Sequence, residues 1–323
     1  MSGHRRAVAG RPGDGPVRTV SAVVARKREG SYLSLTVAAA EIAERARPGQ
    51  FVNVAVNARG SLLRRPFSIY RTTRRGAWAG TIEFVFDPHG PGTEWLGTRQ
   101  AHDLLDLVGP LGSPFPLPNQ RLACLLVAGG YGAAPLFFLG ERLHAEGLRV
   151  DMILGAATGA RIFNAIEAKR MSASVTFTTE DGSLGVDGRV TDVLDDVVGD
   201  AKTGVVYACG PMPMLRAVSL RCAELDIPCQ VAVEEHMACG VGVCWTCVVP
   251  VRAKDGTIRM KRSCVDGPVF NGAHLAWEAS RWHDLDDEFT PSDSSSASGS
   301  RRNESQAVTP EEGEAGLGGE VAS

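Results

Sequence analysis

Three cysteines stand within nine residues of one glycine-lined stretch, EEHMACGVGVCWTC, which runs from Glu234 to Cys247. Their spacing is C-x4-C-x2-C, and Cys264 follows seventeen residues after Cys247. The chain has only 8 cysteines in 323 residues, so the crowding is not a matter of composition. Thiols placed this closely must share one loop. Any fold for this chain therefore has to wrap that loop around a site or bury it.

Four thiolates at this spacing hold a 2Fe–2S cluster in proteins of the plant-type ferredoxin pattern. We predict that the cluster ligands are Cys239, Cys244, Cys247 and Cys264. Gly240 and Gly242 allow the backbone to curl and to turn N–H groups toward the sulfur atoms. A structural zinc site is the main alternative, although zinc motifs usually pair their cysteines in two short knuckles. Free buried thiols are a second alternative; for Cys124, Cys209, Cys222 and Cys229, in apolar runs, a buried side chain is the expectation.

Composition is that of an ordinary globular protein, with 44% hydrophobic and 22% charged residues. A formal net charge of −3 provides no basic field for nucleic acid or an anionic membrane, so neither is an expected partner. No export signal is recognisable, which predicts a cytoplasmic protein with reduced thiols. Leu122 to Gly140 is uncharged and nearly long enough to span a bilayer. Its central glycines and Pro135 instead favour a buried strand, turn and helix.

The rest of the chain divides into blocks that differ in their pattern of expected strands and helices. Residues 17–117 contain six short β-rich runs with Gly and Pro between them, which predicts a closed six-stranded antiparallel barrel. Residues 118–232 alternate strands with helices, which predicts a parallel-sheet nucleotide-binding domain. Residues 233–283 form a small C-terminal domain with the clustered cysteines. Residues 1–16 and the acidic segment 284–323 contain too little apolar surface to fold, so we expect both to be disordered.

Two motifs in the barrel block suit a flavin dinucleotide. LLRRPFSIY places Arg65, Phe67 and Ser68 in the order R-x-[YF]-S. The arginine can meet a pyrophosphate, and the hydroxyl with nearby backbone groups can meet a ring edge. HGPGTEWL then supplies Gly90, Gly92 and Thr93 ahead of a helix, where backbone N–H groups face phosphate oxygens. The pair predicts FAD, although each motif alone is weak.

Two further motifs lie at strand ends of the predicted parallel sheet, where such sheets bind ligands. VAGGYGAAPL contributes Gly129, Gly130, Gly132 and Pro135, and YACGPMPML contributes Cys209, Gly210 and Pro211. The alternative is glycine required only for tight packing. After the third strand, TTEDGSLG presents Glu180 and Asp181. Their carboxylates suit a ribose diol and repel a 2′-phosphate, which favours NAD over NADP.

In motif order the chain resembles the ferredoxin-NADP reductase superfamily. The cysteine loop and RSCVDGPVF narrow the resemblance to electron-transfer subunits of NAD-dependent dihydroorotate dehydrogenases, over about Val17 to His283. The resemblance implies FAD, a 2Fe–2S cluster and NAD as cofactors. It also implies a separate FMN-containing dihydroorotate dehydrogenase catalytic subunit as partner, with two of each chain, acting in pyrimidine (UMP) biosynthesis. Electrons would pass from FMN through the cluster and FAD to NAD⁺.

Some alternatives remain open at this point. A small flavoprotein subunit of a sulfide dehydrogenase or ferredoxin-NADP transhydrogenase resembles the same blocks, but the full cysteine quartet argues against it. A non-catalytic sensor with the same cofactors is a third hypothesis. Trp245 and Thr246, between the second and third cysteines, depart from the pattern. Trp245 is either a docking residue or packed beneath the cluster, and His236 is either a proton relay or a surface side chain.

Overall fold

The computed structural model describes residues 15–58 and 60–279. The two terminal segments expected to be disordered lie outside these residues, except for Gly15 and Pro16. Within the described ranges, no helix is long and apolar enough to cross a membrane. The uncharged stretch from Leu122 to Gly140 forms a strand, a turn and the start of a helix, which confirms the buried interpretation.

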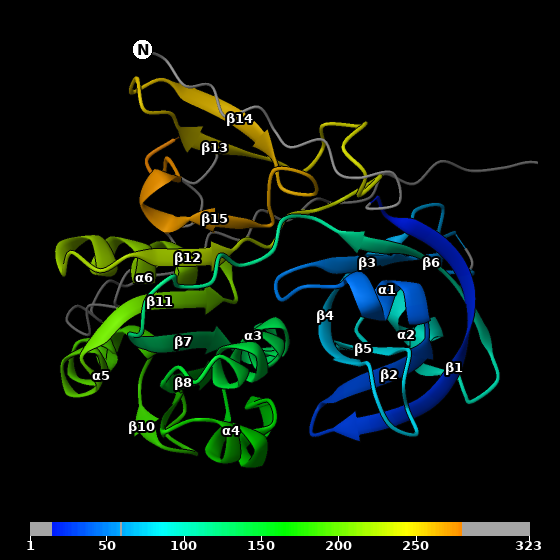
Figure 1. Ribbon diagram of the computed structural model, residues 1–323, viewed down its shortest axis with the longest axis horizontal. Helices are drawn as coiled ribbons and strands as arrows, with labels where there is room; N and C mark the ends of the chain where they lie inside the picture. The colour runs from blue at the N-terminus through cyan, green and yellow to red at the C-terminus, as the bar shows by residue number, and fades with distance from the viewer. Residues whose placement is uncertain (1–14, 59, 280–323) are drawn as a thin grey trace, which may run out of the picture. The chain divides into compact units, whose positions relative to one another are not determined.

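The first block is a closed barrel, as predicted, with strand order β1-β2-β5-β4-β3-β6 (Figure 1). Its strands are antiparallel to their neighbours. Apolar side chains fill its interior, because alternate residues of a strand face opposite sides. The elements of the barrel block are β1 (Val17–Glu29), β2 (Tyr32–Ala38), α1 (Ala40–Arg45), β3 (Phe51–Val54), β4 (Arg65–Thr73), β5 (Thr81–Phe86), α2 (Pro91–Gly97) and β6 (Leu104–Leu111).

The second block forms a seven-stranded sheet of order β10-β9-β8-β7-β11-β12-β15. All pairs are parallel except β12 with β15. The strands are β7 (Ala123–Gly129), β8 (Val150–Ala156), β9 (Ser174–Thr179), β10 (Val186–Asp187), β11 (Thr203–Cys209), β12 (Cys229–Ala232) and β15 (Val269–Asn271). The helices are α3 (Ala133–Ala145), α4 (Ala165–Met171), α5 (Leu194–Ala201) and α6 (Met212–Glu224), with short 3₁₀ turns η1 (Gly130–Gly132), η2 (Gly159–Arg161), η3 (Val190–Asp192) and η4 (Gly272–His274).

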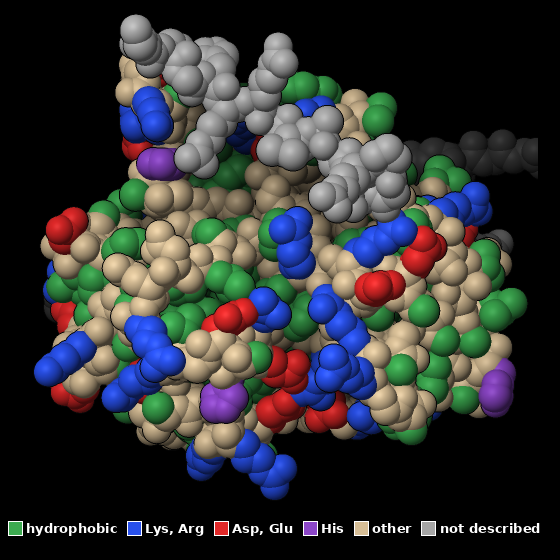
Figure 2. Space-filling view, viewed as in Figure 1, with side chains coloured by type: hydrophobic (Ala, Val, Ile, Leu, Met, Phe, Trp, Pro, Cys, Tyr) green, Lys and Arg blue, Asp and Glu red, His purple; other side chains and the backbone are tan. Residues whose placement is uncertain are grey.

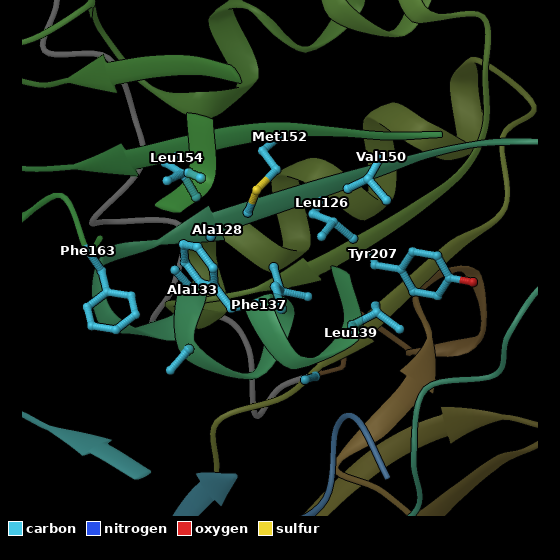
Figure 3. Close-up of a cluster of buried hydrophobic side chains, with 14 of the residues drawn as sticks. Leu126, Ala128, Ala133, Phe137, Leu139, Val150, Met152, Leu154, Phe163 and Tyr207 are labelled. Carbon is cyan, nitrogen blue, oxygen red and sulfur yellow. The ribbon is translucent and has the colours of Figure 1, made fainter. Parts of the chain in front are cut away.

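Both faces of this sheet are buried, which is why the sequences of its strands are continuous runs of apolar residues. Leu126 and Met152 pack with Phe137 of α3 on one face (Figure 3). Leu125 and Ile153, one position along each strand, pack with residues of α5 and α6 on the other face. Helices therefore cover both faces, and ligands of such a sheet bind at the carboxyl ends of its strands.

The cysteine block is not separate from this sheet. Its strands β13 (Val248–Arg252) and β14 (Ile258–Arg262) form a hairpin, whereas β15 joins the edge of the large sheet. The expected parallel sheet is confirmed, and β15, which comes from the cysteine block, adds one antiparallel strand to its edge. A three-residue strand directly after Pro268 has no periodicity that a sequence could reveal. The residue boundaries between the three blocks stay predictions.

Charged side chains join the barrel to the sheet block. Helix α3 packs on β4, and Arg71 of β4 forms ion pairs with Glu141 and Glu167. Acidic and basic side chains gather over this seam (Figure 2). Tyr70 also donates a hydrogen bond of 2.7 Å to Glu167. The seam holds the barrel motifs and the sheet motifs against each other.

Candidate functional site

The first pocket brings together residues of the barrel, the sheet block and the cysteine block. It includes the predicted residues Arg65, Phe67, Ser68, Thr93, Pro135 and Cys209. Gly132 also belongs to its lining. Residues far apart in the sequence, from β4 to the end of β11, therefore form one site. This supports the grouping of the flavin motifs, while the role of each residue stays a prediction.

Arg65 and Gly92 are neighbours, although 27 positions separate them in the chain. A Cβ on Gly92 would lie 3.4 Å from Nε of Arg65, in ordinary contact. Gly90 precedes the first turn of α2, and the Thr93 hydroxyl accepts hydrogen bonds from the N–H groups of His89 and Gly90. Thr93 thus fixes the turn that lies beside the arginine. An arginine beside a helix start is an arrangement that can hold a pyrophosphate.

Phe67 is largely a residue of the barrel interior. Its ring stacks on Phe84 with 5.0 Å between centroids and also approaches Phe86. Ser68, the next residue, is half-buried and lines the same pocket. The packing of Phe67 positions strand β4, and with it the polar groups of Arg65 and Ser68.

The second pocket lies over the carboxyl ends of the parallel strands. Its lining contains Gly129, Gly130, Gly132 and Pro211 of the predicted set, together with Tyr32, Arg161 and Arg189. The two glycine motifs touch: a Cβ on Gly132 would lie 2.8 Å from Cα of Gly210, closer than real side chains permit. The glycine is therefore required for the two loops to meet. A glycine-lined edge of this kind accommodates a dinucleotide.

The two acidic residues after β9 occupy different positions. Glu180 lines the second pocket and lies 3.9 Å from the guanidinium of Arg189. Asp181 does not line it; its carboxylate accepts hydrogen bonds from the N–H and hydroxyl of Ser183. These bonds hold the pKa of Asp181 below its usual value. Glu180 is thus the better placed of the two to meet a ribose.

Sequence reasoning missed a group of residues that bridges the barrel and the second pocket. Arg161 forms an ion pair of 2.7 Å with Asp87, the residue directly after β5. Its guanidinium lies 5.7 Å from the ring centroid of Tyr32, and the Tyr32 hydroxyl donates to the Arg161 carbonyl. No local motif marks these residues. They are brought together only by the docking of the barrel on the sheet block.

Tyr131 and Glu234 stand where the two pockets meet. With Gly132, they are the residues common to both linings. The Tyr131 hydroxyl donates a hydrogen bond of 2.9 Å to Oε1 of Glu234. Burial, followed by the charge of Glu234, raises the pKa of Tyr131 well above its usual value.

The cysteine loop has the local geometry of a sulfur-binding cradle. The N–H groups of Val241 and Val243 each lie 3.4 Å from Sγ of Cys239. Gly240 and Gly242 have φ of +68° and +86°, values that turn these N–H groups inward. Backbone N–H groups directed at sulfur stabilise negative charge on a cluster. The loop therefore fits the predicted cofactor.

The four thiols differ in exposure. Cys244 is exposed, Cys239 is half-buried, and Cys247 and Cys264 are buried. Hydrogen bonds from Thr246 lower the pKa of Cys244 to about 6. Burial raises the pKa of Cys264 to about 12, so a bound metal has to displace its proton. Cys124, Cys222 and Cys229 are buried as expected, whereas Cys209 is half-buried beside the first pocket.

In the described part of the chain, no group of three or more His, Cys, Asp or Glu side chains is arranged to hold a metal ion. A cluster with two irons divides four thiolates between them, so it does not require three around one ion. Zinc, in contrast, needs four ligands around a single centre. What favours iron–sulfur over zinc is the spacing, which places three cysteines in one continuous loop instead of two short knuckles.

Two residues connect the cysteine loop with the first pocket. Phe51 of β3 packs with Cys247, Cys264 and Leu111 in one apolar cluster, and Met237 packs against this cluster. Both Phe51 and Met237 also line the first pocket. The cysteine site and the first pocket are therefore separated by little more than one layer of side chains.

The outer side of the cysteine loop exposes apolar residues. Val243 is 77% exposed and Trp245 is 56% exposed. Arg262 lies 4.7 Å from the Trp245 ring centroid and donates to the Gly242 carbonyl. These side chains are therefore not packed beneath the loop. His236 is also exposed, at a third pocket that Arg65 and Met237 line.

Comparisons with known proteins agree with these features. Residues 234–276 match the family model described as the iron–sulfur cluster binding domain of dihydroorotate dehydrogenase B. The chain is 40% identical over 243 residues to a Desulforamulus reducens protein named dihydroorotate dehydrogenase B (NAD(+)), electron transfer subunit. That match covers 74% of this chain and 90% of the relative. A Geobacillus kaustophilus protein of the same name is 38% identical over 245 residues, covering 75% of this chain and 91% of the relative.

Solved structures support the same architecture. A chain from the structure of an NADH-dependent reduced ferredoxin-NADP oxidoreductase has a TM-score of 0.71 and 28% identity, covering 84% of this chain and 96% of that chain. The ferredoxin reductase of carbazole 1,9a-dioxygenase has a TM-score of 0.56 and 21% identity, covering 66% and 67% of the two chains. The second similarity shows the fold alone.

Proposed function

The chain belongs to the family of dihydroorotate dehydrogenase B (NAD⁺) electron transfer subunits, and from this premise we propose residue roles and a partner. It is an oxidoreductase subunit that uses FAD, a 2Fe–2S cluster and NAD⁺ in pyrimidine biosynthesis. Its catalytic partner is proposed to be an FMN-containing subunit that oxidises dihydroorotate, with two copies of each chain in the complex. The observation that best supports the electron-transfer function is the apolar contact that Phe51 and Met237 make between the cysteine site and the first pocket.

Cys239, Cys244, Cys247 and Cys264 are proposed to hold the cluster. The inward N–H groups of Val241 and Val243 stabilise the extra negative charge of its reduced form. Phe51, Leu111 and Met237 exclude water from the inner side of the site. These residues therefore bind the cluster and set the polarity around it.

The first pocket is proposed to hold FAD. Arg65 and the turn at Gly90, Gly92 and Thr93 face the pyrophosphate, and Ser68 faces the ring edge. The second pocket is proposed to hold NAD⁺, with Gly129, Gly130 and Gly132 and the loop at Gly210 around its phosphates. Glu180 meets the adenosine ribose, and its charge disfavours a 2′-phosphate. Phe67, Pro135, Cys209 and Pro211 shape the walls of the two pockets.

The order of the three cofactors follows from their chemistry. A cluster moves one electron at a time and NAD⁺ accepts a hydride, so a flavin that does both must stand between them. The positions of the pockets suit this order. The first pocket adjoins the cysteine site through Phe51 and Met237, and it meets the second pocket at Tyr131 and Glu234.

The partner is proposed to dock on the exposed side of the cysteine loop. We define the docking patch as Val241, Val243, Trp245 and Val265, which are exposed by 46%, 77%, 56% and 43%. Exposed apolar side chains beside a redox centre are typical of an interaction surface. Docking there would place the partner next to the cluster.

Reconstitution with a dihydroorotate-oxidising FMN subunit tests this function. We expect NADH to form from dihydroorotate and NAD⁺ only when both subunits are present. A chain carrying Cys264→Ser should retain flavin and NADH-dependent dye reduction but fail in the coupled reaction. If the same amount of NADH forms when this protein is omitted, or when it is replaced by the Cys264→Ser variant that lacks the cluster, the proposed electron path is ruled out.

The transhydrogenase subunit is a weaker candidate. Identity to the solved NADH-dependent reduced ferredoxin-NADP oxidoreductase is 28%, against 40% to the dihydroorotate dehydrogenase B relative.

We place the protein in the cytoplasm. Cys222 and Cys229 lie close enough to interact and are free thiols, as in a reducing compartment.

A further inference from the structure

One arginine of the cysteine block contacts the loop that carries the first three cysteines. Arg262 is the last residue of β14, and it pairs with Val248 of β13, the residue directly after Cys247. Its side chain is 29% exposed, and its Nη1 donates a hydrogen bond of 2.7 Å to the carbonyl oxygen of Gly242. Because a guanidinium stays protonated, the hairpin holds a permanent positive charge against the cysteine loop.

The carbonyl that Arg262 contacts belongs to the peptide unit between Gly242 and Val243. The N–H of this same peptide unit, on Val243, is directed at Sγ of Cys239 at 3.4 Å. A trans peptide is planar, so its C=O and its N–H point in opposite directions. The guanidinium, the peptide and the cysteine sulfur therefore form one chain of two hydrogen bonds.

Two further side chains hold the guanidinium in place. Its Cζ lies 4.7 Å from the ring centroid of Trp245, a distance at which a cation is attracted to an aromatic face. The Asp266 carboxylate accepts a hydrogen bond of 2.9 Å from the backbone N–H of Arg262 and lies 3.7 Å from its Nε. The counter-charge therefore stands on the Nε side of the guanidinium, whereas Nη1 is bonded to the loop.

This chain of hydrogen bonds has an electrostatic consequence for the cysteine site. A cation at the carbonyl of a peptide makes its N–H a stronger donor, because hydrogen bonds in a chain polarise one another. A stronger donor at a ligand sulfur stabilises the additional negative charge of a reduced cluster. Hydrogen bonds to the sulfurs are one of the factors that set the potential of such a cluster.

We propose that Arg262 raises the reduction potential of the cluster by polarising the peptide between Gly242 and Val243, whose N–H is directed at Cys239. This inference rests on the proposed function, because it assumes a 2Fe–2S cluster at the four cysteines. Arg262 is a positioning residue, since it acts on the ligand sulfur through the peptide. A higher potential makes the cysteine site a better acceptor for an electron from the FMN subunit.

The test is the midpoint potential of the cluster in the full-length protein, loaded with flavin and cluster. A redox titration followed by the electron paramagnetic resonance signal of the reduced cluster measures it. Arg262→Met keeps an unbranched apolar stem but removes the charge and the donor. We expect the equilibrium constant for one-electron reduction to fall about tenfold, which lowers the potential by about 59 mV. The flavin potential, followed by absorbance, should stay unchanged.

Lys261→Met is the matched control. Lys261 is the neighbouring residue of β14, carries the same charge and lies 3.7 Å from the same carboxylate, Asp266. Its side chain is 46% exposed, so solvent and salt screen its charge. We expect its removal to change the reduction constant by less than about twofold. An equal fall in both variants overturns the proposal, since net charge alone would then explain the effect.

The sign of the shift separates polarisation of the peptide from a merely structural role. A loop loosened by the substitution admits water, which stabilises the charge of the reduced cluster and raises the potential. A potential that rises or stays unchanged in Arg262→Met therefore overturns the proposal. If that variant does not retain iron, Arg262→Gln decides, because it keeps an N–H donor but lacks the charge. Its potential should also be lower, and an unchanged or raised value overturns the proposal equally.

Failure of the underlying function gives a different result. Wild-type protein without iron and labile sulfide contradicts the assignment of the four cysteines, and with it this inference. Wild-type protein with a cluster, together with an Arg262→Met variant of equal potential, contradicts the role of Arg262 alone.

Discussion

Nδ2 of Asn53 donates a hydrogen bond of 2.9 Å to the carbonyl oxygen of Cys239, which ties barrel strand β3 to the cysteine loop. Asn53 is 1% exposed, so this bond is shielded from water. The loop can approach so closely because the next residue is Gly240. A Cβ on Gly240 would lie 2.1 Å from Nδ2 of Asn53.

Gly240→Ala should therefore prevent cluster retention. The residue has φ of +68°, where a side chain costs about 1–2 kcal/mol, and the clash with Asn53 adds to this cost. Gly256→Ala is the matched control, because φ there is +80° and no atom lies within 4 Å of the added Cβ. We expect iron content to fall only in Gly240→Ala. Equal iron in the two variants would show that the contact with Asn53 is unimportant.

Cys264→Ser should bleach the cluster spectrum and leave the flavin spectrum intact. Iron and acid-labile sulfide in the wild type are expected at about two each per chain. Cys124→Ala, which changes a buried thiol of β7, should retain both. Elemental analysis that finds zinc and no labile sulfide in the wild type would disprove the cluster.

Arg65→Ala should weaken flavin retention by about 1.5–3 kcal/mol, the scale of a hydrogen bond to a charged group. The reason is its position beside Gly92 at the start of α2. Flavin release during dialysis measures the effect, and Arg75→Ala, an exposed arginine outside the pocket, is the control. The flavin released on denaturation should be FAD; release of FMN alone would contradict the pyrophosphate role.

Trp245→Ala should weaken binding of the catalytic subunit at least tenfold, about 1.4 kcal/mol, while the cluster spectrum and NADH-dependent dye reduction persist. Trp245 is 56% exposed in the docking patch. Trp78→Ala removes a tryptophan of similar exposure, 51%, from the turn between β4 and β5, and should bind the partner normally. Unchanged complex formation by a cluster-intact Trp245→Ala protein would eliminate the docking role.

Local patterns were sufficient for the parts of the site that one segment builds. The spacing of Cys239, Cys244 and Cys247 is a property of a single loop. The strand-turn-helix at Gly129 to Pro135 was predicted because a buried strand, a glycine turn and a helix start each leave a local signal. The edge strand β15 left no such signal, since three residues are too few for any period.

The sequence by itself determined the barrel, the alternating sheet block and the cysteine spacing, because hydrophobic periodicity and turn residues act over a few positions. Only the tertiary structure decided which distant residues meet. Glu180 and not Asp181 faces the second pocket, Arg161 reaches Asp87, and Tyr131 reaches Glu234. Each of these contacts depends on how the barrel, the sheet and the cysteine loop pack together. That packing is set by the summed burial of apolar surface across whole elements, and no short stretch of sequence encodes it.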